Sequence, residues 1–260
     1  MLARKQSVKN DQDWAEALEH IEETVLKQEL DELLEKTTEE VRKTCEGKQA
    51  AFAWSAGKDS IVLREVCERA GINQCVLVIC ELEYPAFLSW VTENMPDELE
   101  VVNTGQDLDW LAAHQNMLFP QDSATAAKWF HMVQHRGQEK YYKAHGLEML
   151  LLGRRKADGN YVGRGSNIYT NARGMTRYSP ISEWRHEDVL AFLHYYKPAL
   201  PPFYGWKNGF YCGTHPWAAR QWTGSIENGW AEVYDIDPDI VRNAAEKIPS
   251  AEAFLKERES

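Results

Sequence analysis

The feature that most constrains this chain is a short apolar run that passes directly into a small-residue turn and then into a helical pattern. The apolar run, Ala50–Trp54, has the length and composition of a buried parallel strand. The turn reads Ser-Ala-Gly-Lys-Asp-Ser over Ser55–Ser60, and apolar residues then recur at helical spacing as far as Gly71. A strand, a tight turn and a helix in this order predict a loop whose backbone N–H groups bind phosphate, assisted by the positive end of the helix.

The side chains of this loop suit the same ligand. Its candidate binding residues are Ser55, Ala56, Gly57, Lys58, Asp59 and Ser60. The small residues let the backbone approach an anion closely, Lys58 adds a full positive charge, and Asp59 could lie near a Mg²⁺ ion that bridges phosphate oxygens. The loop is not a Walker A loop, because Phe52 replaces the first Gly and Asp follows the Lys. A chance serine-rich turn before a helix is the alternative interpretation.

Further strands alternate with helical segments along the chain. Apolar runs at Cys75–Cys80, Glu100–Asn103 and Glu148–Leu152 predict three more strands, and Ala124–His145 is the longest helical or loop segment between them. Such alternation predicts an α/β fold, a parallel twisted sheet with helices on both faces. The carboxyl ends of the strands then share one edge, where ligands bind in folds of this class.

Composition changes divide the chain into three predicted parts. Residues 1–47 form a helical extension, with one or two amphipathic helices over 11–46. Residues 48–198 form the nucleotide-binding α/β domain, and residues 199–260 an irregular lobe rich in Trp, Tyr and Gly that ends in one helix over Pro238–Arg258. The tryptophans of the lobe are expected mainly to pack it, although they could offer an aromatic surface to a base or a partner.

The bulk properties exclude several classes of protein. A hydrophobic content of 43% is that of a folded chain, and a net charge of −11 disfavours a surface that coats nucleic acid. Nucleic acid is therefore expected only as a substrate to be modified. No apolar run approaches the roughly 18 residues of a membrane span, and residues 1–13 lack the apolar core of a signal peptide. We expect a cytoplasmic protein without a membrane partner.

The cysteines and histidines do not predict a metal centre. The five cysteines, which form no C-x-x-C pair, are Cys45, Cys67, Cys75, Cys80 and Cys212. We therefore expect neither a zinc knuckle nor an iron–sulfur cluster. His131 and His135 are spaced to share one helical face, but no third ligand accompanies them, so a basic face with Lys128 and Arg136 is the preferred interpretation.

Four segments in order resemble the PAPS reductase and ATP sulfurylase family of the PP-loop superfamily, over about residues 48–215. The loop resembles S-G-G-K-D-S, with Ala56 in place of the first Gly. Gly153–Asp158 resembles G-x-R-x-x-E, and Pro180–Val189 resembles P-L/I-x-x-W-x-x-x-D-V. Leu200–Gly213 resembles the L-P-x-x-x-Y…G-x-x-x-G/C region. The resemblance implies the adenine nucleotide alpha hydrolase-like fold and a loop that holds the pyrophosphate part of ATP.

The resemblance also implies further binding residues. The candidates are Gly153, Arg155, Asp158, Arg164, Arg173 and Arg177. Arg155 and Asp158 take the Arg and acidic places of the family motif. The three later arginines could bind phosphate or sulfate oxygens, or could belong to a solvated basic loop. One departure concerns Glu81–Glu83, which stand where the family often has D-T-G, so contacts to the adenosine are not predicted there.

Two reactions fit these residues. The first is ATP cleavage between the α- and β-phosphates, in which an acceptor is adenylylated. Lys58 and Arg155 would stabilise the leaving pyrophosphate, and a Mg²⁺ ion near Asp59 would bridge phosphate oxygens. The Lys-Asp pair resembles that of ATP-using members of the family. The second is reduction of PAPS or APS with Cys212 as the nucleophile, since Cys-Gly-Thr-His superficially resembles the terminal E-C-G-L-H of the reductases. A buried or incidental thiol is the preferred interpretation of Cys212.

A third interpretation is a regulatory protein that binds an adenine nucleotide without turnover. The identity of the acceptor is not encoded in any motif of the sequence. A protein partner or a homodimer is possible, and the acidic helices of the N-terminal extension could provide its contact surface.

Overall fold

The computed structural model describes residues 11–165 and 167–259. Residues 1–10 of the predicted N-terminal extension lie outside the described residues. Within the described ranges, no helix combines the length and the hydropathy that crossing a membrane requires.

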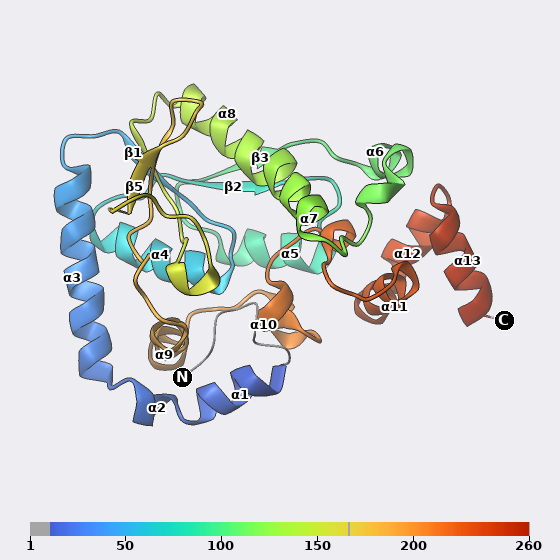
Figure 1. The fold of residues 1–260 in the computed structure, drawn as a ribbon, viewed down its shortest axis with the longest axis horizontal. Coiled ribbons are helices and arrows are strands. Elements are labelled where there is room, and N and C mark those ends of the chain that lie inside the picture. The colour runs from blue at the N-terminus through green and yellow to red at the C-terminus, as the bar shows by residue number, and fades with distance from the viewer. Residues whose placement is uncertain (1–10, 166, 260) are drawn as a thin grey trace.

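A six-stranded sheet forms the centre of the molecule (Figure 1). Its strands are β1 (Ala50–Ala53), β2 (Cys75–Ile79), β3 (Leu99–Asn103), β4 (Met149–Leu151), β5 (Ile168–Thr170) and β6 (Thr176–Tyr178). They lie in the order β3-β2-β1-β4-β6-β5, and every pair is parallel except the edge pair β5–β6. This confirms the predicted α/β fold. β1 and β4, the strands that precede the phosphate loop and the Gly153–Asp158 motif, are neighbours at the centre, so both motifs leave the same edge.

Helices cover both faces of the sheet. The helices of this region are α4 (Lys58–Arg69), α5 (Pro85–Asn94), α6 (Leu108–Ala113), α7 (Ser123–Phe130), α8 (Arg136–Ala144) and α9 (His186–Tyr196), with a π-helical turn, η2 (His131–His135), between α7 and α8. Helices α4 and α9 pack together on one face, and α8 lies on the other (Figure 1). Gly137 lets α8 approach closely, since a Cβ there would lie 2.2 Å from a methyl of Val78.

The edge hairpin β5–β6 was not predicted. The sequence between Gly159 and Tyr178 is Gly-rich and has no apolar run, so only hydrogen bonding to β4 defines it as part of the sheet. This hairpin matters for the site because it carries Arg177 on the strand adjacent to β4.

The N-terminal extension has three helices where one or two were expected: α1 (Asp11–Glu19), α2 (Ile21–Thr24) and α3 (Lys27–Cys45). Helix α3 packs along α4 and α9, whereas α1 reaches the lower edge of the molecule beside α9 and α10 (Gly209–Cys212) (Figure 1). Trp14 of α1 is 1% exposed and stacks on Phe210 with ring centroids 5.5 Å apart.

The predicted final helix is wrong in one respect. Two helices, α12 (Pro238–Ala245) and α13 (Pro249–Arg258), take its place, and α11 (Ile226–Ile236) precedes them. Pro249 has no backbone N–H and its ring excludes a preceding helical turn, so it begins a new helix. Before these helices the lobe is irregular, as expected, with one-turn 3₁₀ segments at η4 (Pro202–Gly205) and η5 (Trp217–Ala219). Further 3₁₀ turns occur at η1 (Gln115–Met117) and η3 (Lys156–Asp158).

Candidate nucleotide-binding site

The phosphate loop begins where β1 ends and closes in the first turn of α4. The Ser60 hydroxyl holds it together, because it accepts a hydrogen bond from the Ser55 N–H at 3.1 Å and donates to the Gly57 carbonyl at 2.9 Å. The Ser55 hydroxyl lies 3.3 Å from that of Ser60. Both serines line a cleft at the start of α4, where hydroxyl donors and a helix N-terminus are suited to a phosphate group.

Ala56 occupies the loop position at which the family pattern has Gly. Its φ is +57° and its side chain is fully buried. A residue with a Cβ costs about 1–2 kcal/mol in this left-handed region, which explains why the pattern has Gly there. The loop nevertheless forms with Ala, at the energetic cost of one strained backbone position.

The loop approaches the C-terminal part of the chain closely. A Cβ at Gly57 would lie 3.3 Å from Ser55 Oγ and 3.4 Å from Thr214 Oγ1. The Lys58 N–H donates a hydrogen bond to the Tyr204 hydroxyl at 2.5 Å. The segment from η4 to residue 215 therefore forms the wall of the cleft that faces the loop.

A chain of alternating charges lies beneath the loop. Lys58 Nζ is 2.7 Å from Asp59 Oδ2, and Asp59 Oδ1 accepts a hydrogen bond from Arg155 Nε at 2.7 Å. Arg155 is fully buried, and its Nη2 lies 3.0 Å from Asp158 Oδ2. Its Nη1 donates to the Trp184 carbonyl at 3.2 Å. Arg155 thus joins the phosphate loop to the motif after β4, and it does not itself line the cleft.

Gly153 permits this junction. A Cβ there would lie 3.1 Å from the carbonyl of Asp59, so any larger residue would push the strand end away from α4. The predicted residues Gly153, Arg155 and Asp158 are therefore brought together with the loop.

Two carboxylates, those of Asp59 and Asp158, line the cleft. Arg155 contacts both of them. Asp158 Oδ1 is buried and receives no hydrogen bond from the described residues; its ion-pair neighbour, His186 Nδ1, is 3.9 Å away. Mg²⁺ commonly binds to one or two carboxylates together with substrate phosphates. Asp59 and Asp158 therefore fit a Mg²⁺ ion that arrives with a nucleotide.

His186 lies beside Arg155 and Asp158 and adds no positive charge to them. Burial lowers its pKa, and the nearby Arg155 guanidinium lowers it further. Its Nδ1 is 3.3 Å from Arg155 Nη2, which places the imidazole as a neutral acceptor for the guanidinium.

The cleft has a volume of about 600 Å³ and contains aromatic as well as charged groups. Phe130 and Trp222 line it and are 39% and 46% exposed, so flat apolar surfaces are available to a ligand. Gln138 also lines it, and its Oε1 is buried without a hydrogen-bond partner among the residues described. Cys212 is half-buried in the same wall.

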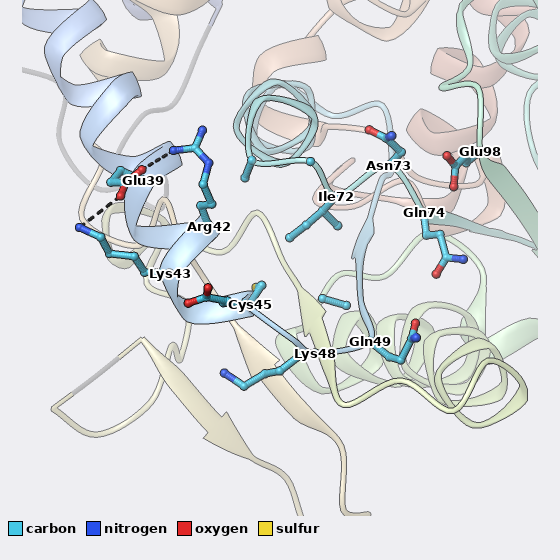
Figure 2. A pocket seen from close by; sticks show the side chains of 14 residues that line it. Glu39, Arg42, Lys43, Cys45, Lys48, Gln49, Ile72, Asn73, Gln74 and Glu98 are labelled. Carbon is cyan, nitrogen blue, oxygen red and sulfur yellow. Dashed lines mark hydrogen bonds and ion pairs between the residues drawn. The ribbon is translucent and has the colours of Figure 1, made fainter.

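A second cavity of about 590 Å³ lies at the opposite edge of the sheet, by the amino ends of β1 and β2 (Figure 2). Three of its charged side chains pair with one another, since Glu39 contacts both Arg42 and Lys43. It lacks the phosphate loop and the strand carboxyl ends. We therefore place the candidate site in the first cleft.

The three later arginines lie at different depths. Arg164 is exposed in the loop after η3. Arg173, in the β5–β6 turn, is also largely exposed and pairs with Glu139 of α8. Arg177 on β6 is only 4% exposed, and its Nη1 lies 3.5 Å from His135 Nε2.

Sequence reasoning missed Arg154. Its side chain lines the cleft, and its two terminal nitrogens lie 3.0 Å from the Tyr169 hydroxyl and 3.0 Å from His135 Nε2. Arg154 and Arg155 are consecutive in an extended segment, so their side chains point to opposite sides. This alternation could have identified Arg154 from the sequence. If Arg155 points to one side of the extended segment, its neighbour Arg154 must point to the other.

Two further predictions concern neighbouring segments. His131 and His135 contact Arg173 and Arg154 respectively, and no group of three potential ligands in the described chain is arranged to hold a metal ion. The Glu81–Glu83 segment differs from the D-T-G of the family pattern. Its Leu82 and Glu83 are buried, and the Leu82 carbonyl accepts a hydrogen bond from the Trp217 N–H. This segment supports the C-terminal lobe.

The sequence matches a protein family over the region that forms this site. Residues 49–210 match the model of the phosphoadenosine phosphosulfate reductase domain. The match covers well over half of the chain, and the chain therefore belongs to this family. No curated protein matches it.

Several solved structures are similar to this chain. Phosphoadenylyl-sulfate (PAPS) reductase from Candida auris, in a phosphate complex, is 15% identical with a TM-score of 0.49, over 68% of this chain and 90% of that one. Candida glabrata FMN adenylyltransferase, with FAD and inorganic pyrophosphate, is 14% identical with a TM-score of 0.49, over 78% of this chain and 69% of that one. Yeast FAD synthetase, with FAD, is 14% identical with a TM-score of 0.41, over 69% and 66%.

Proposed function

We propose that this protein binds ATP with Mg²⁺, cleaves it between the α- and β-phosphates, and transfers the adenylyl group to an acceptor. The observation that carries the proposal is the placement of Asp59 and Asp158 on the cleft beside the phosphate loop, both held by Arg155. Paired carboxylates next to a phosphate loop suit a metal-bound nucleotide. A reaction that depends on a thiol alone has no use for them.

In this proposal the loop receives the β- and γ-phosphates. The N–H groups at the start of α4 and the Ser55 and Ser60 hydroxyls donate to phosphate oxygens, and Lys58 adds positive charge. Asp59 and Asp158 would hold the Mg²⁺ ion, which supplies neutralisation of the charge on the phosphate oxygens. Arg155 is a positioning residue, because it acts through the two carboxylates.

The bonds change as follows. A nucleophilic atom of the acceptor attacks the α-phosphorus and forms a bond to it. The bond from the α-phosphorus to the oxygen that bridges to the β-phosphorus breaks, and its electron pair leaves with pyrophosphate. The loop is already complementary to that leaving group, so its donors stabilise the charge that develops there.

A second candidate is reduction of PAPS or APS, and the position of Cys212 on the cleft favours it. Its thiolate would attack the sulfur of the substrate, and the sulfur–oxygen bond would break with the electron pair leaving on the nucleotide. A dithiol such as reduced thioredoxin would then release sulfite. The other four cysteines are buried. Burial raises the pKa of Cys45 to about 11 and that of Cys75 to about 12, so these thiols would not serve as nucleophiles.

The deciding experiment incubates the protein with ATP, AMP, APS or PAPS and measures pyrophosphate and sulfite. We expect Mg²⁺-dependent pyrophosphate release from ATP, which Asp158→Asn lowers at least 100-fold. Asp97→Asn, an exposed aspartate at the amino edge of the sheet, is the matched control and should release pyrophosphate as the wild type does.

Each other outcome supports a different function. Sulfite release from PAPS with thioredoxin, lost in Cys212→Ser and retained in Asp158→Asn, would replace the proposal by the reductase. Nucleotide binding with neither product would identify a regulatory protein.

A further inference from the structure

Two arginines from different parts of the sheet converge on one histidine beside the cleft. His135 Nε2 lies 3.0 Å from Arg154 Nη2 and 3.5 Å from Arg177 Nη1. Arg154 follows β4, Arg177 lies on β6, and His135 ends the π-helical turn between α7 and α8. We call these three residues the arginine–histidine cluster. It lies on the α8 side of the sheet, whereas Arg155 and its carboxylates lie on the side of α9.

The histidine of the cluster is neutral near pH 7. Burial lowers the pKa of His135 to about 4, and the neighbouring charges of Arg177 and Arg154 contribute, with His131 and Arg173 beyond them. Because arginine nitrogens only donate, Nε2 must be the acceptor nitrogen of the ring. A neutral imidazole thus separates two guanidinium groups that would otherwise repel each other.

No carboxylate neutralises either guanidinium. Glu139, four residues after His135, is paired with Arg173 and Lys143. Asp158, four residues after Arg154, is paired with Arg155. Across residues 11–165 and 167–259, no acidic side chain lies within ion-pair distance of Arg154 or Arg177. In addition, the Nε of Arg177 is buried without a hydrogen-bond partner among these residues.

The other buried arginines of the described chain differ in this respect. Arg155 contacts Asp59 and Asp158, and Arg220 donates to Glu232 at 2.5 Å. Arg177 is as buried as Arg220, at 4% exposed, yet only a neutral imidazole accompanies it. An uncompensated buried charge destabilises a folded protein strongly, so its retention indicates a negatively charged group that is supplied from outside.

The cluster is accessible from the cleft through Arg154. Its side chain lines the cleft, and its guanidinium lies 5.8 Å from the ring centre of Phe130, another lining residue. The π-helical turn ends at His135 and places the imidazole between the arginines; such turns are frequent at functional sites. The phosphate loop follows β1. The two arginines of the cluster come from β6 and from the segment after β4, the next two strands in the sheet order β1-β4-β6.

We infer that Arg154, Arg177 and His135 form a subsite for a phosphate or sulfate group of the second substrate, distinct from the phosphate loop. The group would accept hydrogen bonds from both guanidiniums, and His135 would gain a proton as the anion neutralises its surroundings. The inference rests on the proposed function only in calling the ligand the acceptor. It assigns the acceptor to oxyanion-bearing molecules.

The test measures ion binding without turnover. The full chain is first saturated with pyrophosphate to occupy the loop, and inorganic sulfate or phosphate is then titrated by calorimetry. We expect Arg154→Met and Arg177→Met each to weaken binding of the preferred ion at least 10-fold. Arg136→Met removes an equal charge from an exposed position of α8 and should change the affinity less than twofold. Tighter sulfate binding would assign the subsite to a sulfate group, and tighter phosphate binding to a phosphate group.

Two readouts separate this role from a structural one. The imidazole pKa of His135, followed by NMR and assigned with His135→Gln, should rise at least one unit when the anion saturates. Without anion, Arg177→Met should melt at or above the temperature of the wild type, whereas Arg220→Met, which leaves Glu232 buried without its arginine, should melt lower. Unchanged anion affinity in both cluster variants, an unchanged His135 pKa, or a melting temperature of Arg177→Met as low as that of Arg220→Met would overturn the inference.

Failure of this inference and failure of the proposed function are distinguishable. Anion binding that depends on the cluster, together with no pyrophosphate release from ATP, would retain the subsite and reject the ATP-cleaving activity. Pyrophosphate release from ATP, together with anion binding that the cluster variants leave unchanged, would retain the ATP-cleaving activity and reject the subsite.

Discussion

The hydroxyl of Tyr204 accepts a hydrogen bond from the backbone N–H of Lys58 at 2.5 Å, where the phosphate loop becomes helix α4. That N–H is one of the donors that a helix N-terminus offers to an anion. The tyrosine thus satisfies, from the C-terminal part of the chain, a group that a bound phosphate would use. Binding of a phosphate at this donor requires the hydroxyl to move away.

Replacing Tyr204 with Phe should therefore change stability and affinity in opposite directions. The free energy of unfolding should fall by about 1 kcal/mol, because the Lys58 N–H loses its partner. The dissociation constant for pyrophosphate should fall about fivefold, because no hydroxyl competes for the donor. Urea unfolding and calorimetry measure the two quantities, and weaker pyrophosphate binding in this variant would show that Tyr204 assists the ligand.

Ala56 offers a test of the strained loop backbone. In Ala56→Gly, relief of the left-handed strain contributes about 1–2 kcal/mol, while lost methyl burial and greater unfolded-state freedom each remove roughly 0.5–1 kcal/mol. The free energy of unfolding should therefore stay within about 1 kcal/mol of the wild type. Ala56→Val should lose about 2 kcal/mol or more, because a β-branched residue is least compatible with φ of +57°. Equal stability of the Gly and Val variants would rule out the left-handed conformation.

Glu83 should make stability depend on pH. Burial raises its pKa to about 8, although the Cys80 N–H, at 3.3 Å, partly opposes this. Its pKa in the unfolded chain is about 4.3, so between these values the folded state binds more protons and stability falls as pH rises. The loss approaches about 1.4 kcal/mol per pH unit within that window.

The comparison that isolates this effect is urea unfolding at pH 5.5, 7 and 8.5 for the wild type and Glu83→Gln. The variant should be more stable at pH 8.5 and should lack this component of the slope. Parallel pH profiles for the two proteins would mean that Glu83 is ionised in the folded state.

Trp14 should link the N-terminal extension to the site. Its ring lies 5.7 Å from Lys58 Nζ, stacks on Phe210 and meets His186 edge-on. Trp14→Ala should lower the free energy of unfolding by about 3–5 kcal/mol and should also weaken pyrophosphate binding, because Lys58 loses the surface against which it packs.

Trp230→Ala is the matched control for this prediction. Trp230 is as buried as Trp14 but lies on α11, where it packs against Phe119 and Trp217. Its truncation should cost similar stability and leave pyrophosphate affinity of the folded protein unchanged. Equal effects of the two variants on affinity would remove the specific link between Trp14 and the loop.

Local sequence was sufficient to predict four strands of the sheet, β1 to β4, and the Ser55–Ser60 turn that follows β1. Ala50–Trp54 and Cys75–Cys80 are apolar without interruption, and such runs are typical of strands buried on both faces of a parallel sheet. Ser55–Ser60 follow directly, so the loop inherits its position from the strand. The resemblance to the family was likewise readable along the chain, and the match over residues 49–210 confirmed it.

Tertiary structure alone decided what each charged side chain contacts. Arg154 and Arg155 are the same residue type at consecutive positions, so the sequence does not distinguish them. In the structure Arg155 is buried between Asp59 and Asp158, whereas Arg154 lines the cleft and contacts His135. Arg177 joins them only because the β5–β6 hairpin, which has no apolar signature, adds itself beside β4. Strand and turn propensities depend on neighbouring residues, whereas the balance of charges in a cleft depends on residues that are distant in the chain. For that reason the sequence determined the first strand and the Ser55–Ser60 turn that follows it, and the folded structure determined which cations surround that turn and which of them lack a counterion.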